Sequence, residues 1–510
     1  MPQRRIRLPI LAFFLLLLAL PVFAQSRTFS FDETDCWFPS IQGVTCAVLT
    51  VPEDRTQPNG TQVEIPVAIV SPLSSNPDPV PVVYLEGGPG GATLYSIDSF
   101  LNHPVRQDHT LILFDQRGTG FAQPSLNCWE LEEDTGSGDP VQECRDRLVS
   151  GGVNLQMYNS AASAADVADL VAALGYDQVN LWGISYGTKL GLTILRDFPQ
   201  IVRSAALDSV YAPETDDLQV GTTGFMSAIG ELFDRCAADA ACGSVYPELE
   251  SDFYATLDAL DAEPVDVTDW EGYLVTLDGA ALYDSLFQTL YDSQAIPFLP
   301  YAIELLATSQ SQEEDDAAYA ILSDSEFPIA VGSTADSGIP AVADSAQVQA
   351  YVDEYGDIDD SEGMAYSVDC QEEYQLDDPQ AALRLAAGAP APLNAYFEDG
   401  IQLSLQDCET WNVQTANPIE GQRVVSNVPT LLFAGAFDPV TPVASAQSAL
   451  QGLSNGALLV FPNAGHGITA TDTPAGVCAT DLLVAFFANP TAHLDTSCID
   501  RTAAIDWYAE

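Results

Sequence analysis

The chain has 510 residues, and its 16 Lys and Arg against 73 Asp and Glu give a formal net charge of −57. A charge this negative disfavours binding to nucleic-acid phosphates or to anionic lipid surfaces, which both need clustered Lys or Arg, and Lys189 is the only lysine in the sequence. A hydrophobic share of 47% with 22 Phe, 19 Tyr and 6 Trp is enough for a large core and excludes intrinsic disorder for most of the chain.

Residues 1–24 have the pattern of a secretory signal peptide. Arg4, Arg5 and Arg7 supply positive charge, an apolar run follows over residues 8–23, and a small-residue cleavage site precedes Gln25. A membrane anchor is the alternative, but the run is shorter than the roughly 20 residues that span a bilayer. We therefore expect cleavage after residue 24, no membrane anchor in the mature chain, and a secreted or periplasmic protein.

Residues 25–212 and 416–510 alternate between short apolar runs and helical patterns. We expect strands at residues 63–70, 80–85, 111–114, 179–182, 205–207, 430–433 and 457–461. Apolar residues from Val167 to Leu174 follow the i, i+3, i+4, i+7 spacing of a buried helix, and Gly175 stands where that helix should end. This alternation predicts an α/β fold with a doubly wound, mostly parallel sheet and helices on both of its faces.

The alternation stops after about residue 212. Residues 213–415 are acidic, rich in alanine and mostly helix-like, with few candidates for buried strands, and we interpret acidic stretches such as residues 313–316 as solvated loops. The simplest organisation is one core, formed by residues 25–212 and 416–510, that is interrupted by a large helical cap at 213–415. In such folds an insertion sits at the carboxyl ends of the strands, over the site.

The segment Gly183-Ile184-Ser185-Tyr186-Gly187 lies between an expected strand and an expected helix. This is the setting that a G-x-S-x-G nucleophile elbow requires, because the sharp turn pushes the serine hydroxyl out of the backbone. The flanking glycines are needed because side chains there would collide with the neighbouring strand and helix. The motif alone is weak evidence, but its place between strand and helix makes Ser185 a candidate nucleophile.

A serine that attacks a carbonyl needs N–H donors aimed at the developing oxyanion. The backbone N–H of Tyr186 is one candidate. The second is expected from the glycine cluster at residues 86–91, with Gly88 preferred and Gly87 in reserve, because Pro89 has no N–H. A phosphate-binding loop is the alternative interpretation, but the cluster lacks the G-x-x-x-x-G-K-[ST] pattern.

Asp438 and His466 each follow an expected strand of the second half of the core. Both therefore emerge from carboxyl ends of strands, where Ser185 also emerges. The chain order Ser, Asp, His is one of the orders in which catalytic triads occur. The other histidines lie at the opposite end of a strand or in a C-terminal loop, so we expect a triad of Ser185, Asp438 and His466.

Ten cysteines lie in the expected mature chain, which fits an oxidising compartment. Metal ligation is the competing interpretation, but the sequence has no C-x-x-C pair and only 4 His, so no metal site is expected. We expect disulfides between consecutive cysteines, although sequence alone does not fix the connectivity. The pairs would be Cys36–Cys46, Cys128–Cys144, Cys236–Cys242, Cys370–Cys408 and Cys478–Cys498.

Several segments together resemble the prolyl-aminopeptidase and tripeptidyl-aminopeptidase branch of the α/β-hydrolases. They cover both halves of the expected core, and their sum is far more specific than any one of them. Prolyl aminopeptidases usually have His before the glycine pair, whereas Glu86 in this chain resembles the tripeptidyl branch. The segments are EGGPGG (86–91), DQRGTG (115–120), GISYGTKLG (183–191), LDSVYAP (207–213), SVDCQEE (367–373), GAFDPVTP (435–442) and NAGHG (463–467).

The resemblance implies a helical cap and the release of short peptides or single residues from a free amino end, without a cofactor. An enzyme of this kind must bind the terminal ammonium of its peptide substrate with a carboxylate at a fixed distance from Ser185. Glu372 and Glu373, in the family-like segment beside Cys370, are the candidates, with Glu372 first. Both could equally be ordinary surface acids.

Two other functions remain open. A carboxylesterase or lipase could use the same triad, because a fold does not determine a substrate. A non-enzymatic binding protein could share the scaffold, although a binding protein has no need of Ser185, Asp438 and His466 together. The preferred substrate length, the preferred side chains and the oligomeric state are not determined by the sequence.

Overall fold

The computed structural model describes residues 29–132, 138–269, 272–323, 345–355 and 358–509. The expected signal peptide therefore lies outside the described residues. None of the described helices is both long and apolar enough to cross a membrane.

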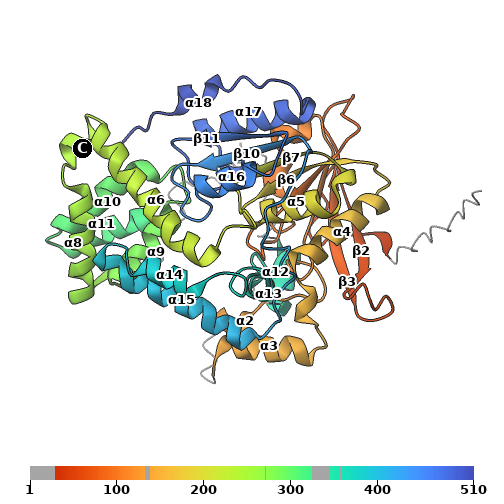
Figure 1. The fold of residues 1–510 in the computed structure, drawn as a ribbon, viewed down its shortest axis with the longest axis horizontal. Coiled ribbons are helices and arrows are strands. Elements are labelled where there is room, and N and C mark those ends of the chain that lie inside the picture. The colour runs from red at the N-terminus through yellow and green to blue at the C-terminus, as the bar shows by residue number, and fades with distance from the viewer. Residues whose placement is uncertain (1–28, 133–137, 270–271, 324–344, 356–357, 510) are drawn as a thin grey trace, which may run out of the picture.

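A nine-stranded sheet forms the centre of the core, in the order β1-β2-β3-β5-β4-β6-β7-β10-β11 (Figure 1). The first three strands pair antiparallel, as do β3 and β5, and the remaining pairs are parallel. The expected strands are confirmed, while β1 and β2 were not predicted. The strands are β1 Ser30–Thr34, β2 Val44–Pro52, β3 Gln62–Val70, β4 Val82–Leu85, β5 Leu111–Phe114, β6 Val179–Ile184, β7 Val202–Asp208, β10 Thr430–Gly435 and β11 Gly456–Phe461.

Helices cover both faces of this sheet, as the continuous apolar runs of its strands require. In β4, Val83 and Leu85 belong to one buried cluster, and Val82 and Tyr84 belong to a second cluster on the opposite face. Helices α4 and α5 pack in the first cluster and helix α17 in the second. The core helices are α1 Asp98–Leu101, α2 Trp129–Glu132, α3 Pro140–Ser150, α4 Ser160–Ala173, α5 Tyr186–Asp197, α16 Val443–Leu450, α17 Pro474–Ala488 and α18 Ser497–Thr502.

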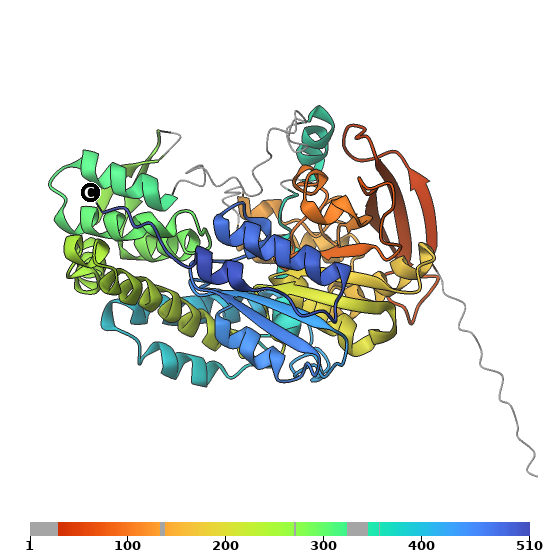
Figure 2. The same ribbon diagram turned by 90° about the horizontal axis from the view of Figure 1, so that it is seen from above.

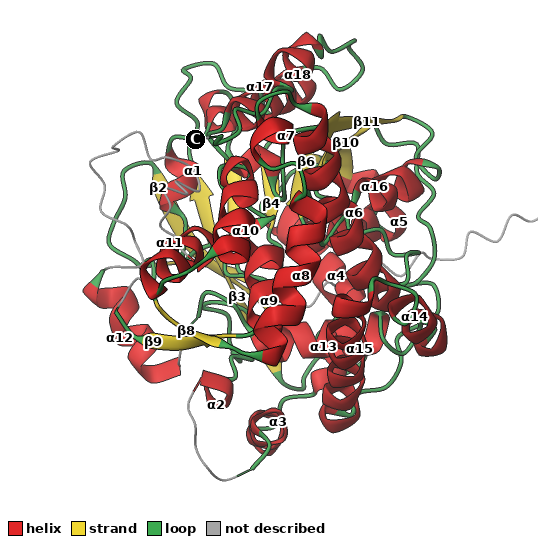
Figure 3. Ribbon diagram, turned by 90° about the vertical axis from the view of Figure 1, so that its left-hand side faces the viewer, coloured by secondary structure: helices red, strands yellow, loops and turns green. Residues whose placement is uncertain are grey.

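The chain between β7 and β10 forms a mainly helical cap with a buried cluster of its own. Figure 2 shows its green helices at one end of the molecule, and Figure 3 shows them from the cap side, in front of the sheet. A two-stranded sheet of β8 Val265–Thr268 and β9 Leu274–Leu277 completes it. The cap helices are α6 Asp217–Ala238, α7 Cys242–Val245, α8 Leu249–Ala262, α9 Gly279–Thr289, α10 Leu299–Thr308, α11 Gln312–Ser323, α12 Ala346–Tyr355, α13 Glu362–Glu372, α14 Pro379–Ala386 and α15 Ala391–Trp411.

One expectation about the cap was wrong. The acidic residues 313–316, interpreted as a solvated loop, open helix α11. Negative charge in the first turn of a helix is favourable because it faces the positive end of the helix dipole. Asp316 also accepts a hydrogen bond from the backbone N–H of Thr268, which ties this turn to β8.

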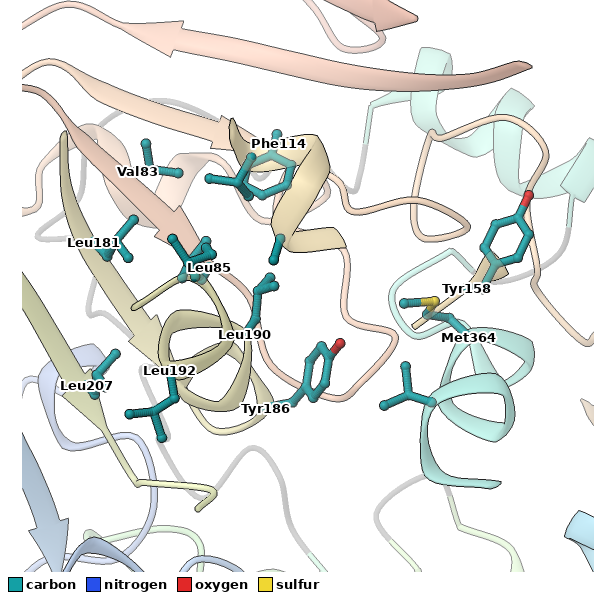
Figure 4. Close-up of a cluster of buried hydrophobic side chains, with 14 of the residues drawn as sticks. Val83, Leu85, Phe114, Tyr158, Leu181, Tyr186, Leu190, Leu192, Leu207 and Met364 are labelled. Atoms are coloured by element: carbon teal, nitrogen blue, oxygen red, sulfur yellow. The ribbon is translucent and has the colours of Figure 1, made fainter. Parts of the chain in front are cut away.

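Core and cap share buried side chains beneath helix α5. Figure 4 shows Tyr186 and Leu190 of α5 in the same cluster as Met364 of cap helix α13. Val368 and Trp411 of the cap belong to this cluster as well. The helix that follows Ser185 is therefore packed against the cap as well as against the sheet.

The ten cysteines form five disulfides, which join consecutive cysteines as expected. All five bonds close loops within one part of the structure, three in the core and two in the cap. They are Cys36–Cys46, Cys128–Cys144, Cys236–Cys242, Cys370–Cys408 and Cys478–Cys498.

Candidate active site

Ser185 lies in a strained turn between β6 and α5. Its φ of 54° and ψ of −127° place a non-glycine residue in a region that favours glycine, which is typical of a residue held by its surroundings for function. A side chain on Gly187 would place its Cβ only 2.0 Å from the carbonyl oxygen of Leu85. The backbone therefore closes as tightly as a nucleophile elbow requires.

His466 and Asp438 form a hydrogen-bonded pair at the ends of β11 and β10. The His466 Nδ1 lies 2.9 Å from Asp438 Oδ2. Asp438 also accepts hydrogen bonds from the Thr441 N–H at 2.8 Å and the Thr441 hydroxyl at 2.7 Å. With Nδ1 facing the carboxylate, Nε2 is the ring nitrogen left to accept a proton from a nucleophile.

The two groups shift each other's protonation equilibria. Burial alone would raise the pKa of Asp438, but His466 and the bonds from Thr441 hold it below its usual value. Burial alone would lower the pKa of His466, but Asp438 raises it above its usual value, with a smaller contribution from Asp208. The pair is therefore suited to stabilise a positive imidazolium once a proton is taken up.

The end of strand β7 connects the Ser185 turn with the His466 loop. The carbonyl oxygen of Asp208 accepts the Ser185 N–H at 3.0 Å, and the Asp208 carboxylate accepts the Thr469 N–H at 2.6 Å. The neighbouring Ser209 hydroxyl accepts the Gly467 N–H at 2.8 Å. These contacts bring Ser185 and His466 to the same edge of the sheet, as the sequence predicted.

The Ser185 hydroxyl makes no hydrogen bond to His466 or to any other described residue. Such bonds are often long in a free enzyme and tighten only when substrate is bound. His466 therefore contacts Asp438 directly. Ser185 is connected to the His466 loop through hydrogen bonds to the end of β7.

Two backbone N–H groups are the candidates for holding an oxyanion. The Tyr186 N–H belongs to the first turn of α5, whose N–H groups have no partner within the helix. A Cβ on Gly87 would meet the Ser185 Oγ at 3.6 Å, so the glycine loop runs beside the hydroxyl. The Gly87 N–H already donates to Glu86 Oε1 at 2.9 Å, which favours Gly88 as the second donor.

Glu372 and Glu373 are buried against Lys189, which lies one helical turn after Ser185. The Lys189 Nζ is 3.1 Å from Glu372 Oε2 and also contacts Glu373. Glu372 accepts two further hydrogen bonds, from the Ser160 N–H at 2.6 Å and the Ser160 hydroxyl at 2.7 Å. These contacts argue against the expectation that either carboxylate binds a substrate ammonium, because a lysine already occupies that position.

The sequence reading missed Tyr291, which follows cap helix α9. Its ring centroid lies 4.9 Å from that of the His466 ring. Its carbonyl oxygen accepts a hydrogen bond from the backbone N–H of His466 at 3.0 Å. The only sequence signal is the i, i+4, i+8 spacing of Tyr283, Phe287 and Tyr291, which is also typical of an ordinary buried helix face.

In the ranges that the structure describes, no three His, Cys, Asp or Glu side chains are grouped so that they could hold a metal ion. The polar groups gathered at the carboxyl edge of the sheet are a hydroxyl, an imidazole, a carboxylate and backbone N–H groups. This set suits nucleophilic attack on a carbonyl with storage of the proton on His466.

The fold and this arrangement define the class of the structure: the chain has the α/β-hydrolase fold. Residues 80–231 match the α/β-hydrolase fold family, and residues 394–498 match the family of TAP-like proteins. The second match covers the end of the cap together with the strands that carry Asp438 and His466.

Its curated relatives include two peptidases and a carboxylesterase. The chain is 26% identical to serine protease Hip1 of Mycobacterium tuberculosis, over 39% of this chain and 43% of the relative. It is 28% identical to a tripeptidyl aminopeptidase of Streptomyces lividans, over 34% of this chain and 37% of the relative. It is also 28% identical to carboxylesterase B of M. tuberculosis, over 46% of this chain and 49% of the relative. The chain thus spans less than half the length of each of these relatives.

Proposed function

We propose that the protein is an exported serine aminopeptidase, which releases single residues or short peptides from free peptide amino ends. Ser185 is its nucleophile, His466 its general base and Asp438 the carboxylate that orients the base. The observation that carries the proposal is the 2.9 Å contact between His466 Nδ1 and Asp438 Oδ2, at the same sheet edge as the strained turn of Ser185.

The reaction has two halves. His466 Nε2 takes the Ser185 proton, the serine oxygen attacks the peptide carbonyl, and the N–H groups of Tyr186 and Gly88 stabilise the oxyanion. His466 then gives its proton to the leaving amine, and an acyl-enzyme remains. In the second half a water molecule loses a proton to His466, attacks the acyl carbonyl and releases Ser185.

Peptides are the favoured substrates because of the peptidase relatives, one of which is named a tripeptidyl aminopeptidase. Export is supported by the five disulfides, since such bonds persist in oxidising compartments. The second candidate is a carboxylesterase with the same triad, which the match to carboxylesterase B favours.

A fluorophosphonate probe tests the triad. The wild-type protein should be labelled on Ser185, whereas Ser185→Ala should lose the label and all hydrolysis. Asn180→Ser, in the same strand but before the turn, is a control for a changed side chain without a changed nucleophile. Persistent labelling of Ser185→Ala would refute the assignment.

A substrate panel then separates peptidase from esterase. Free-amine peptides, the same peptides with acetylated amino ends, and p-nitrophenyl acetate are incubated with the enzyme, and mass spectrometry identifies the products. An aminopeptidase should cut the free peptides near the amino end and spare the acetylated ones. Hydrolysis of the ester without cleavage of any peptide would favour the carboxylesterase.

A further inference from the structure

A cavity of about 790 Å³ lies within the cap, between helices α6, α9 and α15. This volume falls in the range of pockets that hold small-molecule ligands. Leu218 and Phe397 are buried in its wall, whereas Asp284 and Asp399 are exposed at its rim. The cavity therefore has a buried interior and an opening to solvent.

Its lining combines aromatic rings with carboxylates. The rings come from Tyr283, Phe287, Tyr374, Tyr396 and Phe397, and the carboxylates from Asp217, Asp284 and Asp399. No Lys, Arg or His is among the lining residues. Aromatic faces and carboxylates both attract cations, and this combination disfavours anionic ligands.

Two aromatic rings lie in contact between this cavity and the catalytic histidine: Phe287 of helix α9 and Tyr291, which follows the helix. Phe287 lines the cavity, and its ring centroid lies 5.9 Å from that of Tyr291. Tyr291 in turn lies 4.9 Å from the ring of His466. These ring contacts connect one wall of the cavity with the catalytic histidine.

The inner part of the cavity adjoins a cluster with more negative than positive groups. Asp217, in the lining, belongs with Asp369, Glu372 and Glu373 to the carboxylates around Lys189, and burial raises the pKa values of Asp217 and Asp369. The Asp369 Oδ1 is buried without a hydrogen-bond partner.

Glu372 and Glu373 contact the Lys189 ammonium, and its charge also acts on Asp217 and Asp369. Buried carboxylates are costly unless they are paired, so the cluster is more stable when a second cation is present. Because the lining supplies no cation of its own, the ligand is the group that can supply one.

We propose that the cap cavity binds the amino-terminal segment of a cationic peptide, so that the enzyme prefers substrates with Arg or Lys among their first residues. This inference rests on the proposed aminopeptidase function. The aromatic rings contact the side-chain stem, and the carboxylates at the rim and at Asp217 face its charge.

A scan with arginine and citrulline tests this preference, because citrulline has nearly the same shape and no charge. Each residue is placed in turn at the first three positions of an alanine hexapeptide with a free amino end. The preference is the ratio of kcat/KM for the arginine peptide to that for the citrulline peptide. We expect a ratio of about ten or more at one position, as for a hydrogen bond between charged groups.

Variants locate the origin of the preference. Asp217→Asn should reduce the arginine-to-citrulline ratio severalfold. The double variant Asp284→Asn/Asp399→Asn, called the rim variant, should also reduce this ratio. Both of its positions are exposed, so these substitutions do not put folding at risk. Hydrolysis of p-nitrophenyl acetate, measured for every variant, reports whether the catalytic triad is intact. Asp258→Asn, an exposed aspartate of α8 outside the lining, is the matched control and should keep the wild-type ratio.

The outcomes are distinct. A ratio near one at all three positions, with the peptides cleaved, would overturn the cationic preference and leave the aminopeptidase intact. A high ratio that persists in both the Asp217 and the rim variants would overturn the assignment to this cavity. Ester hydrolysis without cleavage of any peptide would overturn the aminopeptidase proposal, and this inference with it.

Discussion

The buried ion pair beneath the active site gives a prediction about stability. Lys189→Met removes the ammonium and keeps a side chain of similar length. The side chains of Lys189, Glu372 and Glu373 are 1%, 0% and 1% exposed, so water cannot replace the lost partner. Removing one partner of a buried pair typically costs about 3–5 kcal/mol. We expect a loss of this size, which is a large part of the 5–15 kcal/mol typical of folded proteins.

Urea unfolding with intact disulfides, followed by tryptophan fluorescence and circular dichroism, measures this loss. Arg384→Met is the control, because Arg384 is 70% exposed and 3.9 Å from Asp378, and an exposed pair of this kind contributes at most about 1 kcal/mol. Adding Glu373→Gln to Lys189→Met should recover part of the stability, because one uncompensated charge disappears. A Lys189→Met variant within about 1 kcal/mol of wild type would refute the reasoning.

Three further predictions concern the site and the cap. Asp438→Asn should lower kcat about 10⁴-fold. It should also shift the acid limb of the pH profile of kcat/KM to lower pH, because Asp438 raises the pKa of His466 and the base must be neutral to accept a proton. An acid limb that does not move would contradict the pairing of His466 with Asp438. Asp208→Asn should lower kcat and leave KM unchanged in steady-state kinetics, because the carboxylate holds the His466 loop through Thr469; a change in KM alone would contradict this role. Replacing Cys370 and Cys408 by serine should cost about 4 kcal/mol in urea unfolding, because the bond closes a loop with a sequence separation of 38; a loss below about 1 kcal/mol would show that the denatured cap is not restrained by this bond.

The sequence predicted the core well because its signals are local. Apolar runs such as residues 111–114 have few alternatives to a buried strand, and the glycines around Ser185 specify a tight turn through their lack of a side chain. The positions of Asp438 and His466 followed from the same reasoning, since the ends of parallel strands share one edge of the sheet.

The remaining features depend on contacts between distant parts of the chain. Glu372 looked available for a substrate because nothing near it in sequence shows that Lys189 lies beside it in the fold. Tyr291 was missed because a cap helix brings it to His466, and its spacing predicts only a buried face. The acidic turn at residues 313–316 was misread because charge alone does not distinguish a loop from the start of a helix.

The disulfides have a consequence for how the core and the cap are held together. Each of the five bonds lies wholly inside the core or wholly inside the cap. Separation of the two parts would break no disulfide. It would break the packing around Met364, the ion pairs of Lys189 and hydrogen bonds such as that from the His466 backbone N–H to the Tyr291 carbonyl oxygen. An oxidising environment therefore rigidifies the core and the cap separately, while packing, hydrogen bonds and ion pairs hold the cap against the core.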